Sequence, residues 1–291
     1  MKKILTRLVI VSFYLLSILP ITILYLLSDI SFFILFYIVG YRKKVVLANM
    51  INAFPEKNSN ELRHIQKGFY KHFCDLIYES VKNLTISKRA IRKRFKVRNL
   101  ELVHTYFEQK RSIILYLGHY GNWEWLAAMS LYVPHQMVAF YQPLSNTLFD
   151  KLIKSSRERF GLIAVKSSQG YKALVDFSNK GILTFTLALG DQSPPAQSDK
   201  HWVTFLNQET AFLTGVDRIA KKMNMVVLFP LFRKISRGHY EIELEIIQEC
   251  MENIESYRII DNYAKQLESA IIHDPALWLW SHRRWKLKKP L

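Results

Sequence analysis

Cysteine, glycine and proline are scarce in this sequence of 291 residues, with 2, 10 and 9 copies respectively. The two cysteines, Cys74 and Cys250, fit no CxxC pattern, which argues against a zinc cluster or a disulfide framework and favours a reducing compartment. No glycine- or proline-rich tract and no fixed-period repeat is present, so fibrous and solenoid folds are excluded. A hydrophobic content of 49% and an aromatic content of 13% exclude intrinsic disorder and can supply a sizeable core.

Acidic residues are also few: 24 Asp and Glu stand against 41 Lys and Arg, a formal net charge of +17. Such a basic chain is expected to bind an anionic partner, which is nucleic acid, an anionic membrane, or an acidic protein or substrate. The excess is concentrated in residues 41–100, which contain 15 basic and four acidic residues, whereas residues 101–291 contain 23 and 19. The basic character therefore belongs mainly to one stretch of the chain.

The longest uncharged run lies directly before that basic stretch. Leu8–Leu27 has 20 residues, and at ~1.5 Å per residue a helix of this length spans ~30 Å, the thickness of a bilayer core. Pro20 is expected to kink this helix. Asp29 interrupts the run, and the uncharged segment Ile30–Tyr41 that follows is too short to span a bilayer alone.

Three interpretations of the N-terminal run compete: a cleaved signal peptide, a buried core helix and a membrane anchor. No small-residue cleavage site follows the run, and it is apolar on all faces, so the first two are disfavoured. Basic residues on both sides, with Arg42, Lys43 and Lys44 nearest, favour the anchor. A single span strands one basic cluster on the wrong side, whereas a hairpin or a segment in one leaflet keeps both on the cytoplasmic face.

From about residue 95 onward, short apolar strands alternate with amphipathic helices. The expected strands are 112–117, 137–141, 162–165, 182–189, 225–229 and 240–247. This alternation predicts an α/β fold with a mainly parallel central sheet flanked by helices, preceded by an N-terminal hydrophobic membrane-anchor helix. The predicted organisation is an anchor at 1–40, a basic helical membrane-proximal region at 41–100, and an α/β catalytic domain at 101–291.

One histidine and one carboxylate stand where such sheets carry chemistry. His119 follows the strand SIILYL at its carboxyl end, and Glu124 lies five residues on in the first turn of the next helix. In that geometry the Glu124 carboxylate is expected to accept a hydrogen bond from the imidazole, which leaves the other ring nitrogen free as a base. Gly118 and Gly121 are expected to allow the sharp turn. A surface histidine beside a capped helix is the competing interpretation.

The segment GHYGNWE at 118–124 resembles the His-x4-acidic motif of glycerolipid acyltransferases, in the form found in the bacterial lipid A biosynthesis (lauroyl/myristoyl) acyltransferase family. The resemblance extends over about 240 residues in several ordered blocks. These are YRKKVVLANMINAFPE (41–56), YQPLSN (141–146), RERFG (157–161), GDQSP (190–194), WVTFLNQETAFLTGVDRIAKK (202–222) and LWLWSHRRWK (277–286).

The resemblance implies an acyltransferase that moves a fatty acyl chain from acyl carrier protein to a hydroxyl of a lipid A precursor. It implies catalysis at the cytoplasmic face of the bacterial inner membrane, with no cofactor beyond the acyl thioester co-substrate. His119 is then the general base and Glu124 the group that orients it, and the activated thioester needs no covalent acyl-enzyme. Acyl carrier protein and anionic lipid are both partners that suit the basic charge.

Six further residues are predicted to bind substrate. Arg157 and Arg159 lie on an amphipathic helix, where they bind lipid phosphate or the oxyanion, or are solvated charges; the resemblance favours Arg157. Asp191 follows a strand, where it positions substrate or caps the loop. The remaining three fall inside or beside the resembling blocks: Asn122, Tyr141 and Gln192.

Other function classes remain as alternatives. A nucleic-acid-binding protein is also basic, but here the basic stretch adjoins an apolar run and no nucleic-acid module is recognised. A purely structural membrane protein does not account for a histidine and a carboxylate at a strand end. Within the enzyme class, the alternative acceptor is another membrane lipid, an aminolipid or a lysophospholipid. Chain length, acyl carrier protein against coenzyme A as donor, and the oligomeric state are left open by the sequence.

Overall fold

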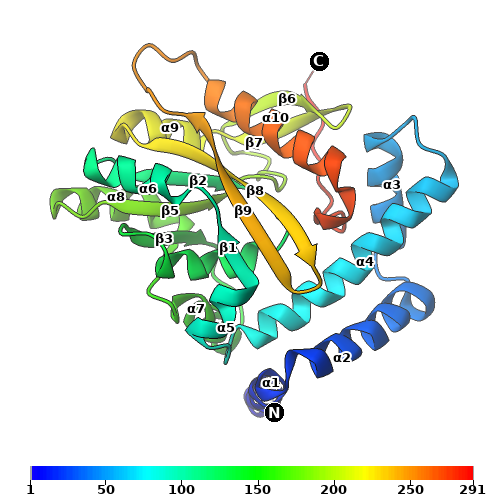
Figure 1. The fold of residues 1–291 in the computed structure, drawn as a ribbon. Coiled ribbons are helices and arrows are strands. Elements are labelled where there is room, and N and C mark those ends of the chain that lie inside the picture. The colour runs from blue at the N-terminus through cyan, green and yellow to red at the C-terminus, as the bar shows by residue number, and fades with distance from the viewer. Residues whose placement is uncertain (1, 291) are drawn as a thin grey trace.

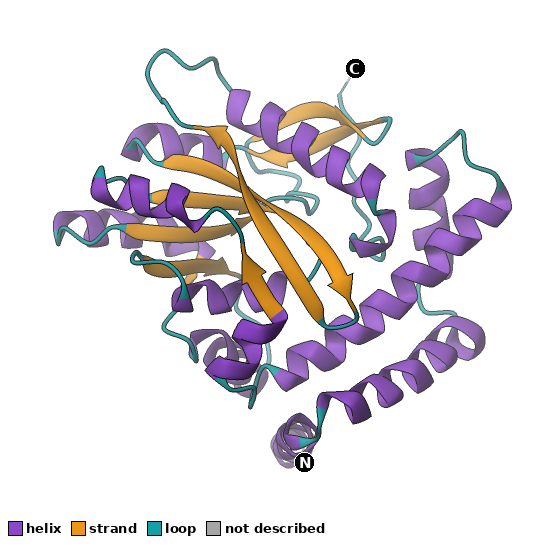
Figure 2. Cartoon of the chain, viewed as in Figure 1, coloured by secondary structure: helices purple, strands orange, loops and turns teal. Residues whose placement is uncertain are grey.

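A seven-stranded sheet forms the centre of the protein in a computed structural model that describes the backbone of residues 2–290 and the side chains of residues 5–290 (Figures 1 and 2). The strand order is β1-β9-β8-β2-β5-β3-β4, and every neighbouring pair is parallel except β8 and β9. The strands are β1 (Phe95–Val97), β2 (Ile113–Leu117), β3 (Gln136–Tyr141), β4 (Ile163–Lys166), β5 (Thr184–Leu189), β8 (Val226–Ser236) and β9 (His239–Gln248). The predicted mainly parallel α/β sheet is confirmed.

The apolar runs of the sequence form the middle of this sheet. All five residues of β2 are buried, because helices cover both faces of the sheet there and neither face meets water. By contrast, β9 alternates between buried and partly exposed residues, as expected for a strand with one covered face. A separate antiparallel hairpin, β6 (Lys200–Phe205) and β7 (Gln208–Leu213), follows the loop after β5.

Helices on both faces complete the layers (Figure 2). They are α5 (Lys88–Arg94), α6 (Leu100–Glu108), η2 (Trp123–Leu131), α7 (Thr147–Glu158), η3 (Ser167–Gln169), α8 (Gly170–Asn179), α9 (Gly215–Met223), α10 (Arg258–His273) and η4 (Pro275–Leu277). Helix α7 begins directly after Asn146, because the Asn146 side chain accepts hydrogen bonds from the backbone N–H groups of Leu148 and Phe149.

Two helices of the basic region, α3 (Lys43–Ala53) and α4 (Ser59–Lys82), lie beside the sheet. Helix α4 begins with a capping box, in which Asn58 and Glu61 each satisfy the other's backbone N–H. It runs along the edge of the body and contacts α2 on its outer side (Figure 1). Strand β1 also falls before residue 101 and pairs with β9, so the sheet draws on the basic region as well.

The N-terminal apolar segment differs from the predicted single kinked helix over Leu8–Leu27. It consists of α1 (Lys2–Ile18) and a second helix, α2 (Ile21–Phe33) continued by the π-helical turn η1 (Ile34–Val39). The chain breaks at Pro20, which has no N–H to continue α1. Asp29 does not interrupt the second helix, and its carboxylate is paired with Arg237. Ile21–Val39, with mean hydropathy 2.1, is therefore the candidate membrane anchor.

Candidate active site

His119 and Asp191 meet at the carboxyl ends of two adjacent parallel strands. Strands β2 and β5 pair in register so that Leu117 lies opposite Leu189, and each functional residue follows its strand end by two positions. The His119 Nδ1 atom lies 2.6 Å from Asp191 Oδ1. The His119 backbone N–H donates to the second carboxylate oxygen, Oδ2, at 2.8 Å. The register of β2 and β5 thus brings His119 and Asp191 side by side.

A third donor from the end of the chain completes the surroundings of Asp191. The indole Nε1 of Trp278 donates to Asp191 Oδ2 at 2.8 Å. Burial alone raises the pKa of this fully enclosed carboxyl, but the adjoining His119 and the donated hydrogen bonds lower it to about 2. Asp191 is therefore ionised, and as an acceptor it leaves the hydrogen on His119 Nδ1 and the lone pair of the neutral ring on Nε2.

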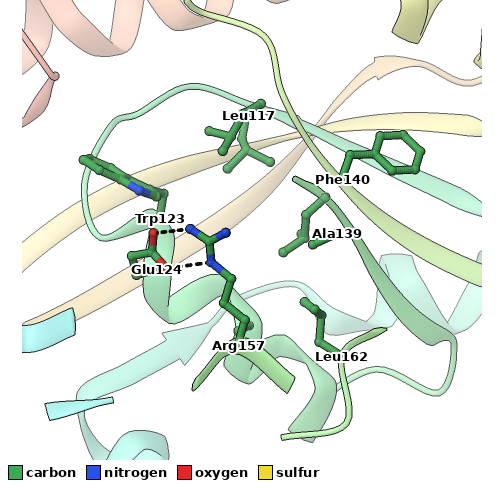
Figure 3. A pocket seen from close by; sticks show the side chains of 10 residues that line it. Leu117, Trp123, Glu124, Ala139, Phe140, Arg157 and Leu162 are labelled. Atoms are coloured by element: carbon green, nitrogen blue, oxygen red, sulfur yellow. Dashed lines mark hydrogen bonds and ion pairs between the residues drawn. The ribbon is translucent and has the colours of Figure 1, made fainter. Parts of the chain in front are cut away.

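The predicted hydrogen bond between His119 and Glu124 is wrong, because Asp191 occupies the imidazole nitrogen instead. Glu124 forms a bidentate ion pair with Arg157, with Nη2–Oε1 at 2.6 Å and Nε–Oε2 at 3.0 Å (Figure 3). Glu124 lies in the 3₁₀ helix η2, and Arg157 lies in the last turn of α7. The carboxylate thus orients an arginine rather than the histidine.

The Glu124–Arg157 pair lines a narrow pocket whose other walls are apolar. Figure 3 shows the pair on one side, with Leu117, Ala139, Phe140 and Leu162 around it. Trp123 also lines the pocket, and its ring packs edge-on against His119 with the centroids 5.1 Å apart. The volume is about 40 Å³, room for only a few atoms, so a long chain requires the walls to move.

Gln192 lies directly beside the free face of the histidine. Its side-chain Nε2 is 3.2 Å from His119 Nε2, on the exposed side of the ring. Of the six residues predicted to bind substrate, Gln192, Asp191 and Arg157 lie around His119 and the pocket. Asp191, however, contacts the histidine itself, so its observed part is to hold the imidazole.

The other three predicted substrate-binding residues lie elsewhere. Asn122 is a buried residue of the loop at 118–122, called the motif loop below. Its side chain caps η2 by accepting a hydrogen bond from the Trp125 N–H. Arg159 donates to the backbone carbonyls of Asn83 and Ile86 at the end of α4, which favours the structural interpretation for this residue. Tyr141, at the end of β3, lines a different hollow, together with lysines of β4 and α8.

The sequence prediction missed two buried residues of α4 that support the motif loop. Glu79 accepts hydrogen bonds from Asn122 Nδ2 at 2.6 Å and from the Tyr240 hydroxyl at 2.9 Å. Burial raises its pKa to about 7. His72 Nε2 lies 3.2 Å from the Gly121 carbonyl, and burial lowers its pKa to about 3, so the neutral ring donates there. The sequence feature that could have identified them is their position as polar residues on the otherwise apolar face of a predicted helix.

The C-terminal segment closes the motif loop from the other side. The Leu279 N–H donates to the His119 carbonyl at 3.0 Å, and the Gly121 N–H donates to the Leu277 carbonyl at 3.1 Å. Gly121 has φ +65°, and a Cβ there would lie 2.6 Å from the Phe232 ring, so glycine is required. The two backbone hydrogen bonds and the conformation of Gly121 fix the position of His119 relative to the end of β2.

Comparison with known proteins agrees with this arrangement. The sequence profile of the bacterial lipid A biosynthesis acyltransferases matches residues 1–287, nearly the whole chain. The chain is also 26% identical over 238 residues to the lipid A biosynthesis acyltransferase of Haemophilus influenzae, which covers 80% of this chain and 72% of that protein. The predicted family and the prediction of an enzyme are confirmed. The chain belongs to the bacterial lipid A biosynthesis acyltransferase family, and it is an acyltransferase.

Proposed function

We propose that the enzyme transfers a fatty acyl group from the thioester of acyl carrier protein to a hydroxyl of a lipid A precursor, at the cytoplasmic face of the inner membrane. The observation that carries this proposal is the His119–Asp191 pair, whose other ring nitrogen faces Gln192, and whose ring packs against Trp123 in the wall of the apolar pocket. A general base close to an apolar pocket can activate a hydroxyl while the pocket holds an acyl chain.

His119 Nε2 removes the proton from the acceptor hydroxyl as the oxygen attacks the thioester carbonyl carbon. The carbon–sulfur bond then breaks, and the departing thiolate takes the proton back from the imidazolium. Asp191 stabilises the imidazolium, because it is ionised and 2.6 Å from Nδ1. Within the described residues, the partners of the His119 ring are Asp191 and Gln192, and neither is a serine or cysteine that could form an acyl-enzyme.

The negative charge that develops on the carbonyl oxygen is neutralised by Arg157. Its Nε and Nη2 are committed to Glu124, which leaves Nη1 to donate toward the pocket. Two other donors near the loop are occupied: the Gly121 N–H binds the Leu277 carbonyl, and Arg159 binds the carbonyls of Asn83 and Ile86. Glu124 is thus a positioning residue for the oxyanion donor, distinct from the histidine pair.

Charge supports the choice of an acidic protein as acyl donor. Acyl carrier protein is acidic, and the net charge of the enzyme is +17. An assay with the purified enzyme compares acyl carrier protein and coenzyme A thioesters of equal chain length. We expect kcat/KM to be higher with the carrier protein and to fall with rising salt. Equal kcat/KM for the two donors contradicts this part of the proposal.

The main test combines one variant with lipid analysis. His119→Ala should lower acyl transfer ~10²–10⁴-fold while leaving the fold intact, measured on purified protein with circular dichroism as the control. Mass spectrometry of membrane lipids from cells lacking the enzyme should show lipid A without one secondary acyl chain. Unchanged lipid A with an altered aminolipid or lysophospholipid contradicts the acceptor and identifies the alternative. Near-normal transfer by His119→Ala contradicts the mechanism.

A further inference from the structure

Helix α2 is bound to the catalytic body along one face by polar side chains. These contacts join residues three apart along α2 to residues 75–79 of α4, the helix that lies beside α2 (Figure 1). They are Tyr25 Oη to Glu79 Oε1 at 2.8 Å, Ser28 Oγ to Asp75 Oδ1 at 2.8 Å, and Ser31 Oγ with Tyr78 Oη at 2.9 Å. We call these three residues of α2 its polar stripe. In a helix surrounded by lipid such a stripe stabilises nothing, because lipid chains offer no polar partner.

Asp29 adds an ion pair from the same helix to the β8–β9 hairpin. Arg237 Nη2 lies 2.7 Å from Asp29 Oδ1, and the same guanidinium also binds Asp75 of α4. Asp29 is near the middle of Ile21–Val39, so in a helix crossing the bilayer its charge would lie near the midplane. A charge at that depth is costly, because no water solvates it there. The docked helix avoids this cost because Arg237 is present.

The turn between the two N-terminal helices is also held by the body. Lys82 Nζ donates to the carbonyls of Ser17 and Leu19, both at 2.8 Å, and the Thr85 hydroxyl donates to the Ser17 carbonyl. Lys82 and Thr85 lie at the end of α4, close to the basic helix α5. A transmembrane hairpin would have to carry this turn to the far side of the bilayer, away from all three contacts.

The opposite faces of α1 and α2–η1 are apolar and exposed. They carry large side chains with half or more of their surface free: Leu8 and Leu15 on α1, and Leu26, Ile30, Phe33 and Ile38 on α2–η1. Basic residues border this surface at both ends, with Lys88 and Arg89 in α5 and Arg42 and Lys44 after η1. An apolar face with basic borders is typical of helices that lie in an anionic membrane surface.

We propose that α1 and α2–η1 lie within one leaflet of an anionic phospholipid membrane, parallel to its plane, and do not cross it. The outer face enters the acyl-chain boundary, while the polar stripe of α2 stays on α4. Ile21–Val39, at ~1.5 Å per residue, is long enough to cross a bilayer, but its polar contacts bind it lengthwise to the body. The inference rests on the membrane attachment in the proposed function but not on the acyl acceptor.

This placement brings the membrane next to the pocket. Helix α1 packs on α7, with the rings of Phe13 and Phe149 6.1 Å apart and Asn146 Nδ2 3.3 Å from the Thr6 hydroxyl. Helix α7 carries Arg157, which lines the pocket. A lipid acceptor can therefore approach laterally from the leaflet without leaving the membrane.

The test labels single cysteines in the full-length enzyme in native membranes. Cys74 is buried and Cys250 is exposed on the body, so wild-type Cys250 marks the side on which the body lies. In a Cys250→Ser background, reporters are placed near the start of α1, at its exposed last residue before the turn, and after η1: Arg7→Cys, Ile18→Cys and Lys44→Cys. Right-side-out spheroplasts and inside-out vesicles are treated with a membrane-impermeant maleimide, and acyl transfer activity checks that each variant is folded.

We expect no reporter to react from the side opposite Cys250, and Arg7→Cys and Lys44→Cys to react from the Cys250 side. Reaction of Arg7→Cys from the opposite side indicates a single span. Reaction of Ile18→Cys from that side indicates a hairpin. Either result overturns the inference, and so does recovery of the wild-type protein in the soluble fraction. None of these results depends on which lipid is acylated, so failure of the acceptor proposal is detected separately.

Discussion

Two buried carboxylates, one at the strand ends and one on α4, receive three hydrogen bonds each and yet have opposite pKa shifts. Asp191 accepts from the His119 backbone, the His119 ring and Trp278, and its pKa is lowered to about 2. Glu79 accepts from Tyr25, Asn122 and Tyr240, and its pKa is raised to about 7. Similar numbers of donors thus give opposite results.

The difference lies in the charge of the neighbours. Asp191 adjoins an imidazole that can become a cation, and this attraction outweighs the cost of burial. Glu79 has hydroxyl and amide donors, while Asp75 nearby adds repulsion to burial. The strand-end carboxylate is therefore suited to stabilise a developing positive charge during catalysis, whereas the carboxylate on α4 is suited to hold the motif loop in place.

Asp191→Asn should give the largest effect. The amide removes the negative charge and can donate to Nδ1, which moves the ring hydrogen to Nε2, where the base is needed. We expect kcat to fall ~10³–10⁴-fold with little change in KM. The pH–rate profile and the thermal unfolding temperature are measured alongside. A loss below tenfold would show that Glu124, or another group, orients the histidine.

Arg157→Lys should have the second-largest effect. Lysine keeps the charge but cannot form the bidentate pair with Glu124 and still direct a donor into the pocket. We expect kcat to fall ~10²-fold, the typical consequence of losing one oxyanion donor. Arg159→Lys is the matched control, because that arginine lies two residues on and binds carbonyls of α4. Equal losses in both variants contradict the assignment.

Glu79→Gln should reduce activity less than the two preceding variants do, but it should lower the stability of the fold more. The amide keeps the volume, but its nitrogen faces donors, so at least one buried hydroxyl or amide loses its acceptor. We expect a loss of ~1–3 kcal/mol in the free energy of unfolding and about a tenfold fall in kcat with KM unchanged. A split of this kind, measured by denaturant unfolding and steady-state kinetics, is expected of a positioning residue. Unchanged kcat with lowered stability would make Glu79 purely structural.

The smallest effect concerns the pH dependence of stability. Because folding raises the pKa of Glu79 from 4.5 to about 7, its contribution is fully present below pH 4.5 and is lost as the pH rises through 7. Asp191 has the opposite sign and changes only below pH 4, as its pKa falls from 3.8 to about 2. Between pH 5 and 8 this loss is opposed by His72, because folding lowers its pKa from 6.5 to about 3 and its contribution therefore grows as the pH rises through 6.5. We therefore expect Glu79→Gln, which lacks the titrating carboxyl, to gain more or lose less in unfolding temperature between pH 5 and 8 than the wild type, measured by calorimetry in the same buffer series.

The sheet was predictable from the sequence because its strands are continuous apolar runs. Helix α7 was predictable because Asn146 supplies a cap and Gly161 an end. The partner of His119 was not, because the His-x4-Glu spacing is visible along the chain, whereas Asp191 is 72 residues away. It meets His119 only through the register of β2 and β5. Pairing two expected parallel strands and inspecting the residues two positions past each end would have found it.

The N-terminal segment shows the same limit. Pro20 was correctly identified as a disturbance, but Asp29 was read as a break in the apolar run. A charge is costly in lipid but does not end a helix, and here Arg237, 208 residues away, pairs with it. Hydropathy along the chain contains no information about such a partner. The predicted boundaries of the anchor therefore shifted from Leu8–Leu27 to Ile21–Val39.

The bond from Trp278 to Asp191 has a consequence for the order of synthesis. The ribosome releases the segment that closes the histidine loop only after nearly the whole chain has emerged, since Leu277 and Leu279 also bind that loop. Helices α1 and α2 leave the ribosome before this segment, so under the proposed membrane attachment they can reach the membrane while the loop is still open. We therefore expect the nascent chain to acquire acyl transfer activity only after Leu277 and Leu279 have folded onto the loop.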